Sequence, residues 1–248
     1  MENLRTIGYR LARITVALAV AIPAGLSMTT TAGAATCSPT GFVRDGIDLT
    51  AAQVGGTVSR SLDATGCDIG VYFATAGSVT SGAQIFGARY FGVVNDGASV
   101  SVAGASIHDI GNNPFDGTQH GVGIYFTNGG SGAIDGNTVS AYQKGGIVVN
   151  GAGTTASITN NSVSGLGPVV FIAQNGIQVS RGAVASVRGN DISDNFYTGE
   201  AGVPNAAGES PEGFEYFSTG LLLFEAGAGT KTANNHFSSN QHNFANVP

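Results

Sequence analysis

Three short polar segments recur along the chain, and each one ends in a glycine. They read Gln119-His120-Gly121, Gln143-Lys144-Gly145 and Gln174-Asn175-Gly176. An imidazole, an amine or a phenol can abstract a proton from a substrate or protonate a leaving oxygen. His120 and Lys144, with Tyr142 next to the second segment, are therefore the candidate catalytic residues.

Amide and aromatic side chains around these segments form a candidate substrate-binding set. Amides exchange hydrogen bonds with sugar hydroxyls, and aromatic rings stack on sugar rings. The members are Gln119, Tyr125, Gln143, Gln174, Asn175, Gln178 and Tyr197. The alternative interpretation is structural: the glutamines form a hydrogen-bonding ladder that stabilises a bend, and nearby acidic residues belong to a solvated face.

The three segments precede short predicted strands that belong to a repeat. A glycine and alternating apolar residues occur at 123–126, 146–149, 176–179 and 220–223. An asparagine stands 14 or 15 residues after each of these glycines, followed two places on by Val, Ile or Phe and then Ser; the four are Asn137, Asn161, Asn190 and Asn235. Three strands separated by a glycine turn and an asparagine turn make one coil of a parallel β-helix.

Stacking of such coils predicts which residues share a face. Equivalent strands lie about 4.8 Å apart, so the three polar segments should converge on one groove. The period of two places inside Ile124, Phe126, Ile147, Val149, Ile177, Val179, Leu221 and Leu223, and outside Tyr125, Val148, Gln178 and Leu222. We expect the repeated asparagines to adopt left-handed backbone conformations at tight bends and to hydrogen-bond along a ladder.

The composition suits a fold of short strands and tight turns. The chain has 39 glycines, no tryptophan and only 10% charged residues. We predict an all-β, right-handed parallel β-helix of about seven coils, its handedness following from crossover chirality. Residues 1–35 are predicted to be a signal peptide, 36–68 an N-terminal cap with an irregular first coil, and 69–248 the β-helix with a C-terminal cap.

The N-terminal segment has the features of an export signal. Arg5, Arg10 and Arg13 precede an apolar run at 14–26, and small residues at 32–34 offer a cleavage site. The run is short for a membrane span, so we expect a secreted, extracellular protein with no membrane span. Loss of three arginines and one glutamate changes the net charge from −6 to −8. This balance, without a basic patch, argues against nucleic acid as a partner.

Two cysteines occur in the sequence, Cys37 and Cys67. An even pair in an exported protein favours a disulfide. It would tie segment 38–66 across the open end of the helix, where unpaired strand edges otherwise invite aggregation. The alternative is a pair of free thiols.

The repeat, the asparagine turn and the export signal together resemble the right-handed parallel β-helix repeat family, the pectate-lyase-like superfamily, over residues 69–243. The strings CDIGVYF, QHGVGIYF, YQKGGIVV, AQNGIQV and GNDISDN look similar to those of exported actinobacterial members. The resemblance implies a groove on the first-strand sheet, Ca²⁺ held by carboxylates, and a basic residue that takes a proton. The outward first-strand positions hold no carboxylate here, so that Ca²⁺ site cannot be carried over. No metal site is assigned, and the cofactor stays open, with Ca²⁺ as one alternative.

Two functions follow from this interpretation. The first is an enzyme acting on an extracellular polysaccharide in a groove formed by loops that enter the first-strand sheet, as a lyase or a hydrolase. Hydrolysis requires two facing carboxylates, for which Asp109, Asp116 and Glu200 are candidates. The net charge of −8 repels polyuronates unless Lys144, Arg181 or a cation compensates locally. The second function is a non-catalytic secreted solenoid that binds a polysaccharide or a cell-surface glycan.

Overall fold

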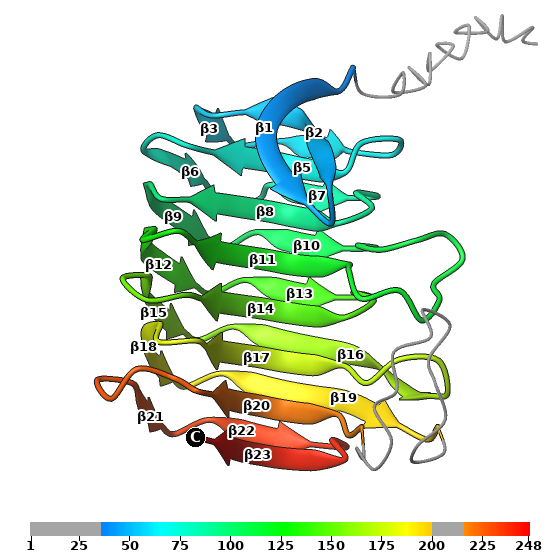
Figure 1. Cartoon of the computed structure of the whole chain (residues 1–248), viewed down its shortest axis with the longest axis vertical. Coiled ribbons are helices and arrows are strands. Elements are labelled where there is room, and N and C mark those ends of the chain that lie inside the picture. The colour runs from blue at the N-terminus through cyan, green and yellow to red at the C-terminus, as the bar shows by residue number, and fades with distance from the viewer. Residues whose placement is uncertain (1–35, 200–215) are drawn as a thin grey trace, which may run out of the picture. The chain divides into compact units, whose positions relative to one another are not determined.

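The chain forms a right-handed parallel β-helix, which confirms the predicted fold class (Figure 1). The computed structural model describes residues 36–199 and 216–248. The predicted signal peptide, 1–35, lies outside these residues. Within them, no helix is long and apolar enough to cross a membrane.

Three sheets run the length of the β-helix. Sheet A contains β1(Ser38–Arg44), β2(Ile47–Val54), β5(Ile69–Phe73), β8(Phe91–Asp96), β11(Val122–Thr127), β14(Gly145–Asn150), β17(Asn175–Ser180), β20(Thr219–Phe224) and β23(His242–Val247). Sheet B contains β3(Thr57–Val58), β6(Gly77–Val79), β9(Ser99–Ala103), β12(Ser131–Asp135), β15(Thr155–Thr159), β18(Val184–Arg188) and β21(Lys231–Ala233). Sheet C contains β4(Ser61–Asp63), β7(Gln84–Phe86), β10(Ser106–His108), β13(Thr138–Ser140), β16(Ser162–Val169), β19(Asp191–Tyr197) and β22(His236–Ser238).

Each coil contributes one strand to each sheet, and the described residues contain seven complete coils from β2 to β22, followed by β23. The β-helix therefore starts one coil before residue 69, because β2 already pairs in parallel with β5. The repeat does not reveal this coil. The position on β2 that pairs with Val71 is Gln53, a polar residue, so the apolar alternation fails there.

The core is a column of apolar side chains inside the coils, in the predicted register. Ile124, Ile147 and Ile177 stack on one another through strand pairing, and each is 0% exposed. Leu221 continues the column at 1%. The residues between them face outward, although Tyr125 and Val148 are also buried because other residues cover the outer face of sheet A.

The repeated asparagines form the predicted hydrogen-bonding ladder. Asn137 donates through Nδ2 to Asn161 Oδ1, Asn161 donates to Asn190, and Asn190 donates to Asn235, each at 2.9 Å. The prediction of left-handed conformations at these asparagines is wrong. The residue before each one has the positive φ instead, for example Asn160 at 56°, and this turn points the ladder amide inward.

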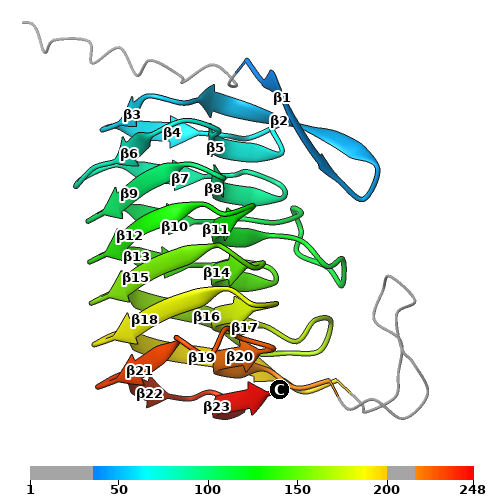
Figure 2. The same cartoon turned by 60° about the vertical axis from the view of Figure 1, so that its left-hand side comes forward.

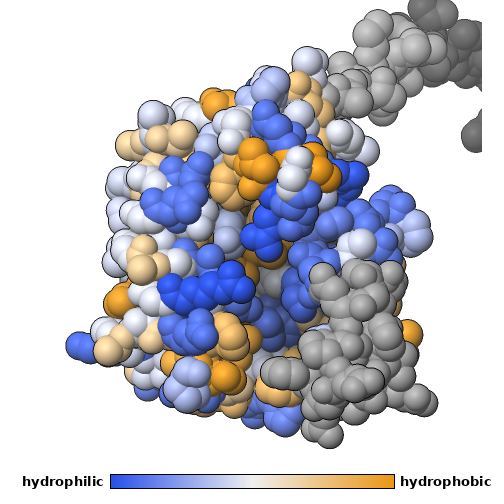
Figure 3. All heavy atoms as spheres, in the orientation of Figure 1, coloured by the Kyte–Doolittle hydropathy of each residue, from blue (hydrophilic) through white to orange (hydrophobic). Residues whose placement is uncertain are grey.

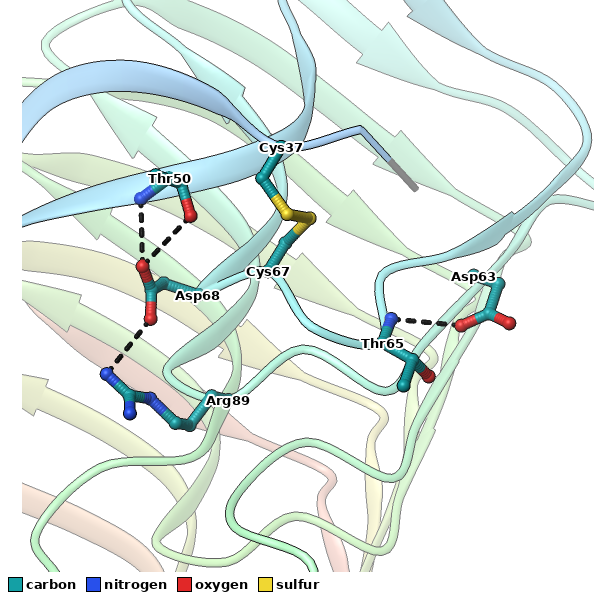
Figure 4. Close-up of a disulfide and its surroundings, with 7 residues drawn as sticks. All are labelled: Cys37, Thr50, Asp63, Thr65, Cys67, Asp68 and Arg89. Carbon is teal, nitrogen blue, oxygen red and sulfur yellow. Dashed lines mark hydrogen bonds and ion pairs between the residues drawn. A yellow bond between two sulfur atoms is a disulfide. The ribbon is translucent and has the colours of Figure 1, made fainter. Parts of the chain in front are cut away.

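Cys37 and Cys67 form the predicted disulfide, with their Cα atoms 5.5 Å apart (Figure 4). The next residue, Asp68, accepts hydrogen bonds from the backbone N–H and the hydroxyl of Thr50, and its other oxygen lies 3.1 Å from the Arg89 guanidinium. The disulfide thus ties the start of β1 to a well-bonded corner between the first two coils.

The N-terminal hairpin departs from the solenoid pattern. β1 pairs with β2 in antiparallel fashion, and the hairpin projects over the outer face of sheet A (Figures 1 and 2). Phe42 on β1 packs its ring against Tyr72, Phe91 and Tyr125, with ring centroids 6.0 to 6.5 Å apart. This second apolar cluster fixes the hairpin on the sheet.

Candidate functional site

A groove of about 340 Å³ lies on the outer face of sheet A, beside the hairpin. In Figure 3 this face shows a hollow near its centre, bordered by hydrophilic side chains. The groove is lined by Arg44, Phe91, Gln119, His120, Val122, Tyr125, Lys144, Val148, Asn150, Asn175, Gln178, Arg181, Leu222 and Phe224. Its floor comes from β8, β11, β14, β17 and β20, and its walls come from the hairpin and from the turns at both ends of these strands.

Most of the predicted site residues meet in this groove. The loops that end at Gln119, His120 and Lys144 enter neighbouring strands of sheet A, because parallel pairing sets Val122 beside Gly145. The remaining members are Tyr125, Asn175 and Gln178. The repeat alone places these six side chains on one strip.

Tyr142 does not reach the groove, and its predicted catalytic role is wrong. Its side chain is 0% exposed, and its hydroxyl donates to Asn195 Oδ1 at 2.6 Å. Burial raises the pKa of the phenol far above its ordinary value. A phenol locked in this way exchanges no proton with a ligand in the groove.

Gln143 and Gln174 are also completely buried, so they do not bind substrate directly. Gln143 accepts the backbone N–H of Asn112 at 3.0 Å and donates to the Thr118 carbonyl at 2.8 Å, which holds the loop at 109–121 in shape. Gln174 donates to the Tyr142 carbonyl at 2.6 Å. These contacts match the structural alternative in effect. Gln174 also donates to the Gln143 backbone carbonyl at 3.2 Å, but no hydrogen bond joins the two glutamine side chains, and Gln143 donates to Asp116 and Thr118 of the loop instead.

Tyr197, the last residue of β19, is likewise outside the groove. Its side chain is 6% exposed, and the groove lining does not include it. The described residues thus do not bring Tyr197 together with the six predicted residues that line the groove. Glu200, one of the candidate carboxylates, lies outside the described residues.

His120 is held in one orientation from two sides. Its ring packs on Tyr90, with centroids 4.2 Å apart and planes 31° apart. Its Nε2 lies 2.9 Å from Asn112 Oδ1, and Asn112 donates through Nδ2 to Asp116 Oδ2 at 2.8 Å. Since the carboxylate fixes the amide orientation, Nε2 must carry the proton that Asn112 accepts, and Nδ1 keeps its lone pair.

The surroundings of His120 favour its neutral form. Partial burial lowers the pKa of the imidazole, and the nearby Arg89 guanidinium lowers it further, while Asp116, Asp45 and Asp68 partly oppose this shift. A histidine that is neutral at pH 7 and has an unprotonated Nδ1 can serve as a general base.

The groove gathers positive charge on an acidic protein. Arg44, Lys144 and Arg181 line it, and the described part of the chain contributes no carboxylate to its lining. The Lys144 ammonium also donates to the Ala173 carbonyl at 3.0 Å. Arg44 was not found from the sequence because it lies on the antiparallel hairpin, outside the repeat.

Within the described residues, the groove lining offers no carboxylate for the Ca²⁺ site that the resemblance to pectate lyases implies. Hard cations such as Ca²⁺ take six to eight oxygen ligands, with carboxylates prominent among them. Residues 36–199 and 216–248 contain no group of three or more His, Cys, Asp or Glu side chains placed to hold a metal ion.

A larger hollow of about 690 Å³ is lined by part of the loop at 109–121 and by residues 65–68, Gly87 and Arg89. Its charged residues are already engaged with each other or with the loop: Asp68 pairs with Arg89, and Asp116 accepts from Asn112 and Thr118. The smaller groove has the charges and the oriented histidine, and is therefore the better candidate site.

No curated protein and no solved structure matches this chain. One family model does, described as the right-handed beta helix region, and it covers residues 46–237. The matched span includes every strand from β2 to β21, almost all of the predicted repeat and all the groove residues except Arg44. The chain therefore belongs to the right-handed β-helix family.

Proposed function

We propose that this protein is exported, binds an acidic extracellular polysaccharide in the groove and cleaves it by β-elimination, with His120 as the base. The observation that carries the proposal is the combination of a neutral, oriented imidazole with three basic side chains in one groove. The family is compatible with proteins that act on polysaccharides, and its fold supplies the scaffold rather than the chemistry.

The elimination has a simple balance. The base removes the proton on the carbon next to the uronate carboxylate, the glycosidic C–O bond on the following carbon breaks, and a C=C bond forms between the two carbons. The leaving oxygen takes up a proton from His120 or from water. Negative charge grows on the carboxylate as the proton leaves, and the cations of the groove stabilise that charge. Lys144 is the second candidate for the proton transfers.

The same groove is poorly suited to hydrolysis. Glycosidases place two carboxyl groups about 5 to 9.5 Å apart across the bond. Within the described residues the groove lining has neither, and Asp116 is committed to Asn112, Thr118 and Gln143 inside its loop. Asp109 also lies outside the groove lining.

A polysaccharide screen of the purified protein tests the proposal. Acidic and neutral polysaccharides are incubated with the protein, and both the ultraviolet absorbance of unsaturated products and the number of new reducing ends are measured. Elimination raises both signals, whereas hydrolysis raises only the second. Retention of a glycan without either signal would instead support the non-catalytic solenoid, and no product and no retention on any acidic polysaccharide would refute the proposal.

A further inference from the structure

Side chains on the groove floor form one directional chain of hydrogen bonds. Asn175 donates to Gln178 Oε1 at 3.1 Å, and Gln178 donates to Ser180 Oγ at 3.1 Å. Ser180 then donates to Asn150 Oδ1 at 3.0 Å, and Asn150 donates to the Tyr125 hydroxyl oxygen at 3.3 Å. The amide orientations follow from this network, and every donor points toward Tyr125.

The two ends of this hydrogen-bond chain differ in the partners that their polar atoms have. At its start, Asn175 Oδ1 is buried and has no hydrogen-bond partner, and the hydroxyl of Thr219, its neighbour on β20, has none either. At its end, the Tyr125 hydroxyl accepts from Asn150, and no described residue accepts its hydrogen. The Tyr125 O–H is therefore left for a ligand at the end toward which the hydrogen bonds run, while the Asn175, Gln178 and Asn150 amides each keep a second N–H.

The Tyr125 hydroxyl is also fixed in position. The ring is 7% exposed and stacks on Phe91, with centroids 4.9 Å apart and planes 26° apart. A hydroxyl that already accepts a hydrogen bond becomes a stronger donor, because successive hydrogen bonds polarise one another. Such a donor pairs best with a charged oxygen.

We propose that the Tyr125 hydroxyl determines specificity by donating to an anionic oxygen of the bound glycan, such as a uronate carboxylate. Arg44 and Arg181 line the same groove and supply the complementary charge. This inference rests on one part of the proposed function, namely that a glycan binds in this groove. The role of the Tyr125 hydroxyl requires that the glycan binds, but not that it is cleaved.

The first test removes the hydroxyl and keeps the ring. Binding of oligosaccharides of galacturonic, guluronic, mannuronic and glucuronic acid, and of their carboxyl-reduced forms, is measured by calorimetry with His120→Gln protein to prevent turnover. Adding Tyr125→Phe should weaken binding of the preferred acidic oligosaccharide about tenfold or more, since a hydrogen bond to a charged group is lost. Binding of the reduced form should change less than about twofold. The matched control is Tyr197→Phe, which removes a hydroxyl outside the groove.

The second test interrupts the hydrogen-bond chain that leads to Tyr125. Gln178→Met removes the amide that links Asn175 to Ser180 and keeps the side-chain length, and a double-mutant cycle with Tyr125→Phe measures the coupling. The loss of binding free energy caused by Tyr125→Phe should be smaller in the Gln178→Met background than in the protein that keeps Gln178. Equal costs in both backgrounds, or an unchanged preference for the acidic form in Tyr125→Phe, overturn the inference and leave the proposed function standing. Failure of every acidic oligosaccharide to bind overturns both.

Discussion

His120 shows how a loop residue acquires a defined chemical state. Tyr90 limits the tilt of its ring, and Asn112 selects which nitrogen carries the proton. Asp116 in turn orients Asn112, and Gln143 holds the loop that bears both residues. The buried glutamine is therefore a supporting residue of the site.

The first prediction concerns the base. His120→Gln should lower the turnover of the cleaved polysaccharide about 10²-fold or more, since a general base contributes on that scale. The melting temperature should change little, because the half-buried side chain is replaced by one of similar size. His108→Gln is the matched control: that ring stacks on Phe86, 5.2 Å away, outside the groove lining. Equal turnover of the two variants would show that His120 is not the base.

The second prediction concerns pH. The folded-state pKa of His120 lies below its ordinary 6.5, so the elimination rate should be at full level at pH 7 and fall only as the pH drops through the lowered pKa. Arg89→Gln removes a charge that lowers this pKa, and therefore should move the acid limb of the rate profile to higher pH. Arg60→Gln, a change at an exposed arginine outside the groove, should leave the limb in place. An acid limb that moves to lower pH in the Arg89→Gln variant would contradict the assignment of His120 as the base.

Six of the residues singled out from the sequence line one groove, whereas the sequence could not show which neighbouring side chains are buried by distant partners. His120 and Lys144 could be placed together because each stands at the end of a loop next to a repeated strand. Tyr142 has the same sequence context, yet its hydroxyl has a buried partner, Asn195, 53 residues further along the chain. No local pattern shows such a partner.

At the scale of strands and turns, the asparagine ladder sets the spacing of the coils. Each ladder amide except the last bonds both to the next asparagine and to a strand carbonyl, as Asn161 Nδ2 does with Asn190 and Ile134, each at 2.9 Å. Asn235, the last, donates to the Val187 carbonyl. The ladder was predictable because the repeat aligns the asparagines. The left-handed residue was assigned one position too late, since asparagine suits both places and sequence alone does not distinguish them.

The third prediction tests the ladder. Asn161→Ala should lower the free energy of unfolding by about 2 kcal/mol or more, because at least two buried polar groups lose their partners. Asn160→Gly is the control, since it changes an exposed asparagine with φ of 56° to the residue that prefers this conformation. Urea titration of both variants gives the two values. Similar losses in the two would mean that the ladder is not stabilising.

The fourth prediction tests the register of β17. Ile177→Asp places a charge in the dry core column, whereas Gln178→Asp changes a residue on the groove side. The first variant should therefore be less stable by several kcal/mol than the second. Equal melting temperatures would show that the inward and outward assignments are exchanged.

The whole β-helix depends on how its ends are closed. The Cys37–Cys67 disulfide closes a loop with a sequence separation of 30 residues, which holds the N-terminal hairpin to the first coils. The antiparallel hairpin was not predictable, since the repeat describes parallel strands alone. It nevertheless contributes Arg44 to the groove and Phe42 to the outer cluster.

The fifth prediction follows from this cross-link. Replacing both cysteines with serine should lower the free energy of unfolding by about 2 to 4 kcal/mol, as loop closure of this length implies. Ligand binding should weaken as well, because the hairpin that bears Arg44 is less firmly held. Denaturant titration and calorimetry measure the two effects. Wild-type stability in the double variant would contradict the structural role of the disulfide.

The asparagine ladder also bears on how such a protein can change over generations. Its amides bond to one another and to strand carbonyls such as those of Val102, Ile134 and Ile158, none of which belongs to the loops that enter sheet A. A loop there can lengthen, shorten or be exchanged while the coils keep their alignment. The scaffold thus separates heritable variation in the groove from the integrity of the fold, and new ligands become accessible by loop replacement without redesign of the core.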